Sequence, residues 1–205
     1  MKLNLGCGER VVPGWTNVDY AIGARLARLR FVGPALSKLK ILRTTWPSDI
    51  FIHDLRSGIP FADESIDVVY SSHFLEHLSR QEGAQLLRDC RRVLKPGGIL
   101  RIVVPDLAAI VEKYLSKELK AERFCEELGV LSADNRDSKI KSLFAPFVRF
   151  PHQCMYDEAA LLLLFNQIGI AAAPRRAFES AIGNIAEIEI EARTIEAVIV
   201  EGIKR

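Results

Sequence analysis

The feature that most constrains the fold of this chain is a tight glycine-containing turn between two short apolar segments. It lies in the stretch LNLGCGERVVPGWTNVDY at residues 3–20. Gly6 and Gly8 bracket the turn, and the second segment ends in the acid Asp19. Strand, glycine turn and strand in this order are typical of a nucleotide-binding α/β unit. A crossover that includes a helix needs at least about 10 to 12 residues, and Pro13 and Gly14 stand where that helix would lie. We therefore expect one helical turn at most between the two strands.

The glycine pattern distinguishes two kinds of adenosine cofactor. The dinucleotide fingerprint needs a third glycine and a helix N-terminus that holds the pyrophosphate. The third glycine is missing here, and Asp19 follows Gly6 by 13 positions, against about 20 in that fingerprint. S-adenosylmethionine carries no phosphate, so it needs only close backbone approach at Gly6 and Gly8 and a carboxylate, Asp19, for the ribose hydroxyls. The residues favour S-adenosylmethionine, and a nicotinamide-dependent oxidoreductase is the alternative enzyme.

Length and composition predict a globular protein with a single domain over residues 1–205. The chain is 49% hydrophobic and 26% charged, which is enough to bury a sizeable core. Its longest apolar run, AALLLLF at 159–165, is far shorter than the roughly 20 residues that span a bilayer. Strand-like sequence begins at Lys2 and leaves no room for a signal peptide, so we expect a cytoplasmic location. The net charge of +2 is too mild to indicate a nucleic-acid partner.

The cysteines suggest neither a zinc site nor a disulfide framework. The four of them lie far apart, with no CxxC pair and no histidine at ligand spacing: Cys7, Cys90, Cys125 and Cys154. We expect free thiols and no metal. Cys7 is expected to be a small residue that fits the tight turn, because neither a base nor a second thiol is its neighbour in the sequence.

Short apolar runs alternate with helical periodicity, which predicts a Rossmann-like α/β fold, doubly wound, with a mostly parallel sheet and helices on both faces. Strands are expected at 50–55, 66–73 and 98–106, and the tail at 194–204 is expected to be an edge strand. Ligands of such sheets bind outside the carboxyl ends of the strands. One rim should therefore gather the polar residues that follow the strands: Asp19, Asp54, Ser71, Ser72, His73 and Asp106.

Three helices are expected. The best marked begins at Ser79, where Glu82 completes a capping box, and it ends in the KPGG sequence at 95–98. Another runs from about Asp157 to Gly169. The third, over about 107–119, should turn one face inward: Leu107, Ile110, Val111, Tyr114 and Leu115. The EIEIE stretch at 187–191 fits a strand or a short helix equally well.

Four longer stretches match one protein family in order and cover about half of the chain: LNLGCGERVVPGWTNVDY, HDLRSGIPFADESIDVVYSSHFLEHL, LRDCRRVLKPGGILRIVVPDL and PHQCMYDEAALLLLFNQIGI. The chain thereby resembles the class I S-adenosylmethionine-dependent methyltransferases. It is most similar to the small bacterial enzymes of methyltransferase type 11 that are often associated with cell-envelope polysaccharide genes.

The resemblance implies a set of cofactor-binding residues. Gly6 to Gly8 would line the methionine part, Asp19 would bind the ribose, and Asp54 would contact the adenine. The strand end from Ser71 to His73 would lie beneath the sulfonium. The full implied set is Gly6, Cys7, Gly8, Asp19, Tyr20, Asp54, Leu55, Ser71 and Ser72.

Two insertions, at about 21–49 and 120–150, depart from the family pattern. The first has no acid before Asp49, and apolar residues interleave with its basic ones: Arg25, Arg28, Arg30, Lys38, Lys40 and Arg43. It could close over the cofactor, contact a membrane surface peripherally or bind a phosphate-bearing acceptor, and the alternative is a solvated helical insertion. The second insertion would form a lid on the acceptor side.

Methyl transfer from a sulfonium is an in-line displacement, so the protein must mainly align the reactants and exclude water. The product would be S-adenosylhomocysteine, and the favoured acceptor is a saccharide or another small hydroxylated molecule. Removal of its proton would need a base, which is most often histidine near neutral pH. The candidates are His152, which we prefer, and His73, although either could be a binding contact or a satisfied polar residue. Outside the enzymes, the alternative is a noncatalytic S-adenosylmethionine-binding subunit.

Overall fold

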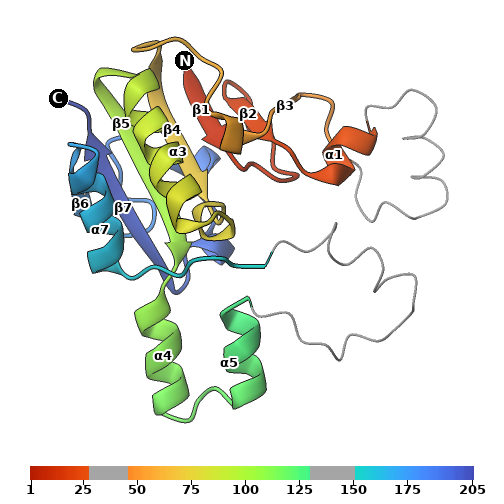
Figure 1. The fold of residues 1–205 in the computed structure, drawn as a ribbon, viewed down its shortest axis with the longest axis vertical. Coiled ribbons are helices and arrows are strands. Elements are labelled where there is room, and N and C mark those ends of the chain that lie inside the picture. Colours follow the sequence, from red (N-terminus) through yellow and green to blue (C-terminus); the bar gives the residue numbers. More distant parts are fainter. Residues whose placement is uncertain (28–45, 130–150) are drawn as a thin grey trace.

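The structure, a computed structural model, describes residues 1–27, 46–129 and 151–205. Its centre is a seven-stranded sheet with the order β3-β2-β1-β4-β5-β7-β6 (Figure 1). The strands are β1 (Lys2–Leu5), β2 (Thr16–Asp19), β3 (Ile50–Ile52), β4 (Ile66–Ser72), β5 (Leu94–Pro105), β6 (Ala171–Pro174) and β7 (Ala197–Ile203). The predicted Rossmann-like α/β fold is confirmed.

The sheet is mixed in direction. Strands β1 to β5 pair in parallel, whereas β7 runs antiparallel to both of its neighbours. The C-terminal strand is not the edge strand that the tail predicted, because β6 pairs with its outer side. The short AAAP sequence of β6 carries no alternation from which a strand could have been expected.

Two long helices cover one face of the sheet, α3 (Arg80–Val93) and α7 (Glu158–Gln167) (Figure 1). The predicted capping box at Ser79 and Glu82 is present, and Asp157 caps α7 by accepting from the amide of Ala160. Their apolar sides pack on the central strands in the larger core cluster, which includes Leu5, Val69, Leu86, Leu87, Cys90, Val104, Leu161 and Phe165.

The opposite face is covered mainly by irregular chain. The loop that follows the glycine turn and a segment containing η3 (Ile185–Glu187) and η4 (Glu191–Arg193) pack there. The EIEIE stretch therefore belongs to two short 3₁₀ helices and their connection, not to a strand. This second cluster includes Val12, Trp15, Tyr70, Val103, Ile185, Ile188 and Ile199.

Helix α3 ends earlier than the KPGG sequence predicted. Leu94 already pairs with Ile66 of β4, and the next pair joins Ile99 to Val68. Residues 95–98 bulge out between these pairs, where Pro96 cannot donate a backbone hydrogen bond and Gly97 adopts a φ of 81°. The proline and glycines thus interrupt a strand as well as limit a helix.

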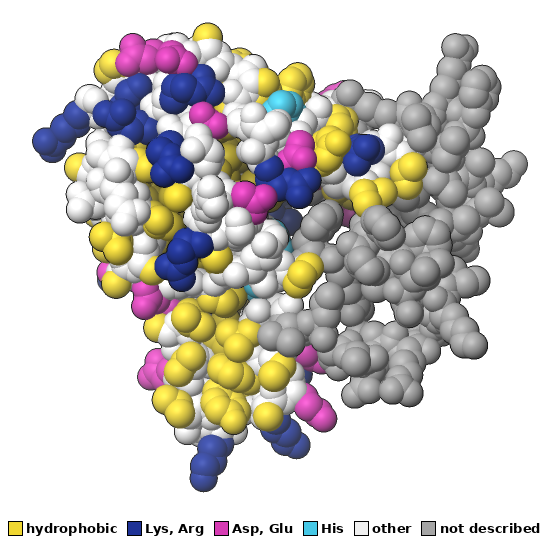
Figure 2. Space-filling model, in the orientation of Figure 1, with side chains coloured by type: hydrophobic (Ala, Val, Ile, Leu, Met, Phe, Trp, Pro, Cys, Tyr) yellow, Lys and Arg dark blue, Asp and Glu magenta, His cyan; other side chains and the backbone are white. Residues whose placement is uncertain are grey.

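Helices α4 (Leu107–Leu115) and α5 (Ala121–Glu127) project beyond the sheet (Figure 1). The predicted inner face of α4 is wrong at its far end, because Tyr114 is 40% exposed and Leu115 is 73% exposed. Tyr114 instead stacks on Phe124 with ring centroids 4.4 Å apart. Figure 2 shows hydrophobic side chains gathered over these two helices.

Most of the two predicted insertions, residues 28–45 and 130–150, lies outside the described residues. The expectations for Arg28, Arg30, Lys38, Lys40 and Arg43 therefore stay predictions. The helix α1 (Ile22–Ala27) includes Arg25, whose guanidinium lies 4.4 Å from the ring centroid of Tyr20. In the described part of the chain, no helix is both long and apolar enough to cross a membrane.

Candidate functional site

The glycine turn is fastened to the strand beside it. The amides of Gly6 and Cys7 both donate to the carbonyl of Val18, at 2.9 and 3.1 Å. Asp19 then closes the turn, because its Oδ2 accepts from the amide of Gly8 at 2.7 Å. Its Oδ1 accepts from the amide of Ala21, also at 2.7 Å. Each oxygen of this carboxylate keeps a lone pair for a further donor.

Gly6 is required by space as well as by backbone angle. It adopts a φ of 66°, and a Cβ atom at this position would lie 2.4 Å from the ring of Phe74. Phe74 lies two residues after the end of β4, so the turn after β1 and the chain after β4 meet at Gly6. At the rim predicted from the strand ends, the side chain of Phe74 therefore packs directly on Gly6.

No helix lies between β1 and β2, in agreement with the short spacing, and an asparagine network holds the loop instead. Asn17 is 2% exposed, and its Oδ1 accepts from Nδ2 of Asn4 at 3.0 Å and from the amide of Val12 at 3.1 Å. Its Nδ2 donates to the carbonyls of Val12 and Trp15. The loop is therefore held by one buried amide side chain, which satisfies backbone groups that a helix would have paired internally.

The predicted adenine contacts lie at the end of β3. Asp54 caps the 3₁₀ helix η1 (Leu55–Ser57) by accepting from the amide of Arg56, and it forms an ion pair with that guanidinium at 2.7 Å. Hydrogen bonding to Arg56 lowers the pKa of Asp54. The carboxylate thus acts as a loop cap, and Leu55 beside it is buried.

The serines at the end of β4 are buried and differ from each other. Ser71 donates its hydroxyl to the carbonyl of Leu5 at 3.2 Å, so it ties β4 to β1. Ser72 Oγ is buried and has no hydrogen-bond partner among the described residues. Asp106, at the end of β5, caps α4 by accepting from the amide of Ala108.

An open cavity of about 480 Å³ lies against the glycine turn. This volume is in the range of small-molecule sites. Its lining joins the turn to residues from distant parts of the chain: Gly8, Glu9, Arg10, Trp46, Ile190 and Arg193. Sequence reasoning missed Trp46 and Arg193, because neither belongs to a recognisable motif and only the fold brings them to the turn.

His73 directly follows β4 in a left-handed conformation, with a φ of 52°. Its Nε2 lies 2.9 Å from the carbonyl oxygen of Arg193, and its Nδ1 lies 3.4 Å from Oε1 of Glu76. Burial alone would lower the pKa of His73, but Glu76 and the Arg193 carbonyl outweigh it and raise that pKa above its ordinary value. Both ring nitrogens are therefore engaged.

His152 lies beside the 3₁₀ helix η2 (Leu75–His77), next to His77. Its Nδ1 is buried without a hydrogen-bond partner in the part of the chain that the structure describes. Burial is the main cause that lowers the pKa of His152, and His77 and His73 lower it further. The structure thus brings both candidate histidines to Glu76, a residue that the sequence analysis did not single out.

Cys7 lies in the turn and is only 2% exposed. Burial, with the nearby charge of Asp19, raises the pKa of Cys7 to about 12. The thiol is therefore protonated at neutral pH, in agreement with a packing role. All four cysteines lie in the described residues, and they are free.

Comparisons with known proteins agree with this geometry. Residues 3–102 match the family model of a methyltransferase domain. A protein of Mycolicibacterium smegmatis named "Probable S-adenosylmethionine-dependent methyltransferase" is 35% identical over 145 residues, which cover 66% of this chain and 52% of that protein. The chain thus spans about half the length of this curated relative.

Solved structures share the fold at low sequence identity. An S-adenosylmethionine-dependent methyltransferase from Methanosarcina mazei has a TM-score of 0.53 at 19% identity, covering 99% of this chain and 91% of that chain. A protein from Pyrococcus horikoshii has a TM-score of 0.54 at 19% identity, covering 100% and 81%. At this identity the likeness concerns the fold alone.

Proposed function

Residues 3–102 form a class I S-adenosylmethionine-dependent methyltransferase domain, and from this premise we propose that the protein methylates a small hydroxylated acceptor of saccharide type. The cofactor is S-adenosylmethionine, and the product of its use is S-adenosylhomocysteine. A role in cell-envelope polysaccharide synthesis and a cytoplasmic location belong to the same proposal. The polysaccharide role is supported by the resemblance of the sequence motifs.

The observation that carries the proposal is the position of Asp19. Its two oxygens already hold the amides of Gly8 and Ala21, so the carboxylate is fixed at the carboxyl end of β2. The remaining lone pairs suit the two hydroxyls of a ribose, and the glycines allow the backbone of the turn to approach the methionine part. The shortened crossover offers no helix dipole for a pyrophosphate, which disfavours the nicotinamide alternative.

In the proposed reaction, the protein accelerates methyl transfer mainly by aligning the methyl donor with the acceptor oxygen. The methyl carbon forms a bond to the acceptor oxygen while its bond to sulfur breaks, and the sulfonium becomes a neutral thioether. Holding donor and acceptor in line can account for a large part of such a rate enhancement. The cavity beside the turn supports a polar acceptor, because an indole and guanidinium groups line it at Trp46, Arg10 and Arg193.

The acceptor hydroxyl must also lose its proton. Both nitrogens of His73 are engaged by Glu76 and by the carbonyl of Arg193, which argues against a free imidazole base there. His152, the preferred candidate from sequence, keeps an unpartnered Nδ1 within the described residues. Its surroundings, the buried carboxylate of Glu76 and the ring of His77, indicate a different role.

The proposal is tested by the variant Asp19→Ala, with cofactor affinity measured by calorimetry. Loss of a charged acceptor costs about 1.5 to 3 kcal/mol per hydrogen bond, so affinity for S-adenosylmethionine should fall by roughly 10-fold to more than 100-fold. Asp157→Ala is the matched control, since Asp157 also accepts from a backbone amide but lies at the start of α7. Equal affinity of Asp19→Ala and the parent would contradict the assignment.

Two further measurements separate the alternatives. Tighter binding of NADH than of S-adenosylmethionine by the parent protein would favour the oxidoreductase. A protein that binds S-adenosylmethionine, yet forms no S-adenosylhomocysteine with any of a panel of saccharides or with a cell extract, would fit the noncatalytic subunit. Formation of a methylated sugar with stoichiometric S-adenosylhomocysteine is the result we expect.

A further inference from the structure

Glu76 is a buried carboxylate that lacks the partners such a group needs. It is 1% exposed, and neither of its carboxylate oxygens accepts a hydrogen bond from any described residue. Its closest ion-pair contact among the described residues is with His73, whose Nδ1 lies 3.4 Å from Oε1. A charge buried with so little compensation is costly, and buried charges are normally paired or coordinate a metal.

Two histidines complete a set of ligand atoms around this carboxylate. Glu76, His77 and His152 each offer one atom, and these atoms all lie within 4.8 Å of one another. The rings of His77 and His152 approach edge to face, with centroids 5.0 Å apart. His152 Nδ1 is itself buried without a hydrogen-bond partner in the described part of the chain.

The backbone holds the two contributing segments together. The carbonyl of Glu76 accepts from the amides of Gln153 and Cys154, at 2.7 and 3.1 Å. The side chain of Gln153 donates from Nε2 to the carbonyl of His77 at 2.8 Å. These three hydrogen bonds join η2 to residues 151–154, so the ligand set is built into the fold although its members are 76 positions apart at the extremes.

We propose that Glu76, His77 and His152 bind a divalent transition-metal cation of the zinc class. One carboxylate with two imidazoles is the ligand set of several catalytic zinc sites, in which a fourth position stays open. Imidazole selects such ions over magnesium or calcium. A bound ion would take its ligand atoms at about 2.0 to 2.2 Å, and the three atoms already lie within 4.8 Å of one another.

This site goes beyond the methyl-transfer proposal and differs from the expectation of no metal, which rested on the spacing of cysteines and histidines along the sequence. It also gives His152 a role as a ligand in place of a free base. An oxygen in the open position of a bound cation loses its proton more readily. The cluster follows the end of β4 directly, beside His73, so such an ion would lie close to the rim.

The test is a titration of the full chain, freed of any purification tag, with Zn²⁺ and with Co²⁺ in the absence of S-adenosylmethionine. We expect one site with a dissociation constant of about 1 μM or tighter and the visible absorption of Co²⁺ bound by nitrogen ligands. The variants Glu76→Gln and His152→Ala should each weaken binding by about 100-fold or more. Circular dichroism of each variant verifies that it folds.

His53→Ala is the matched control. It also removes an imidazole, but His53 lies outside the cluster and pairs with the carbonyl oxygen of Gly58 at 2.8 Å. Its metal affinity should stay within about threefold of the parent, less than 1 kcal/mol. The proposal is overturned if the parent binds neither ion, or if Glu76→Gln and His152→Ala both bind as the parent does. Cofactor affinity is measured separately, so loss of the methyl-transfer proposal would leave this result unaffected.

Discussion

Two clusters of buried charge differ in one respect. Arg101 on β5 is fully buried, and its guanidinium binds Glu189 through two hydrogen bonds of 2.9 Å and Glu201 through one of 3.0 Å. Around Glu76, by contrast, both carboxylate oxygens lack a hydrogen bond within the described residues. The carboxylates around Arg101 thus have hydrogen-bond partners without any ligand, whereas the carboxylate of Glu76 has none among the described residues.

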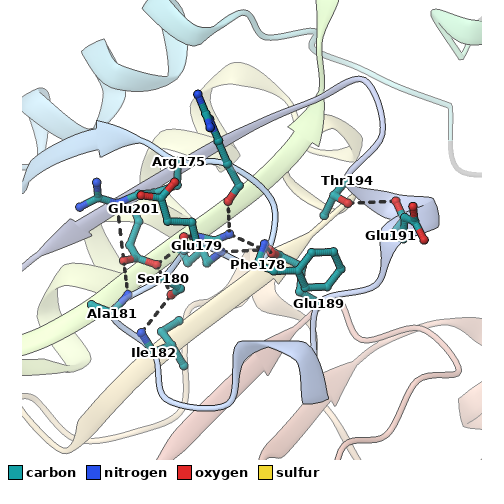
Figure 3. A network of polar contacts seen from close by, with 12 residues as sticks. Arg175, Phe178, Glu179, Ser180, Ala181, Ile182, Glu189, Glu191, Thr194 and Glu201 are labelled. Carbon is teal, nitrogen blue, oxygen red and sulfur yellow. Dashed lines mark hydrogen bonds and ion pairs between the residues drawn. The ribbon is translucent and has the colours of Figure 1, made fainter.

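The surroundings of Glu189 and Glu201 show what completeness means (Figure 3). Glu189 also accepts from the amide of Phe178, and Glu201 accepts from the hydroxyl of Ser180 and the amide of Ala181. Both oxygens of each of these two carboxylates therefore accept at least one hydrogen bond. A polar group left unsatisfied in an otherwise well-paired fold calls for an explanation, and ligand binding is the one that we test.

The largest effect that would sharpen this comparison is expected from Arg101→Met. The change leaves the buried Glu189 without its counter-charge and Glu201 with only the exposed Arg175 at 3.9 Å, which costs about 3 to 5 kcal/mol of unfolding free energy. Denaturant unfolding followed by circular dichroism measures it. Arg123→Met is the control, because Arg123 is 64% exposed and pairs with Glu126 on α5, and such pairs contribute about 0 to 1 kcal/mol. Equal stability of the two variants would break the comparison.

A smaller effect of opposite sign is expected from Glu76→Gln in metal-free buffer. Replacing an unsatisfied carboxylate by a neutral amide of the same shape should raise the unfolding free energy by about 1 kcal/mol. Glu82→Gln serves as control, since Gln also completes a capping box at that position. If Glu76→Gln is instead destabilised by more than 1 kcal/mol, the ion pair with His73 already satisfies the carboxylate.

The smallest effect concerns thiol reactivity at the rim. Because burial and the charge of Asp19 raise the pKa of Cys7 to about 12, its reactive thiolate is scarce at pH 7 and stays scarce up to pH 9. Native-state alkylation, followed by mass spectrometry, should therefore label the exposed Cys125 well before Cys7. Raising the pH from 7 to 9 should leave Cys7 unlabelled. Early labelling of Cys7 would mean that the turn opens to solvent.

The sequence predicted those parts of the fold whose signals are local. Glycines, a short spacing and a terminal acid were sufficient for the turn at Asp19, and a capping box was sufficient for the start of α3. Tyr114 and Leu115 were expected inside because periodicity shows which face of a helix is apolar, not whether a sheet lies beneath it. For α4 the neighbour is α5, and that contact is tertiary.

The residues of the candidate site that the sequence did not predict are brought there by long-range contacts. Arg193 reaches the cavity from 185 positions after Gly8, and no spacing rule links them. Glu76 was not singled out from the sequence, because no spacing rule places its carboxylate beside His73 and His152. The metal-ligand role of His152 depends on the hydrogen bonds of Gln153, which only the fold reveals.

The Arg101 network also sets an order in which parts of the nascent chain can fold. Its partner carboxylates follow 88 and 100 residues later in the chain, which is a delay of about 5 to 20 seconds at ordinary rates of translation. Until Glu201 has left the ribosome, the Arg101 guanidinium must stay in water and the β5 side of the sheet cannot close. His73 likewise waits for the carbonyl of Arg193. A nascent chain can thus form the glycine turn early, but its rim becomes complete only when the last strand has been made.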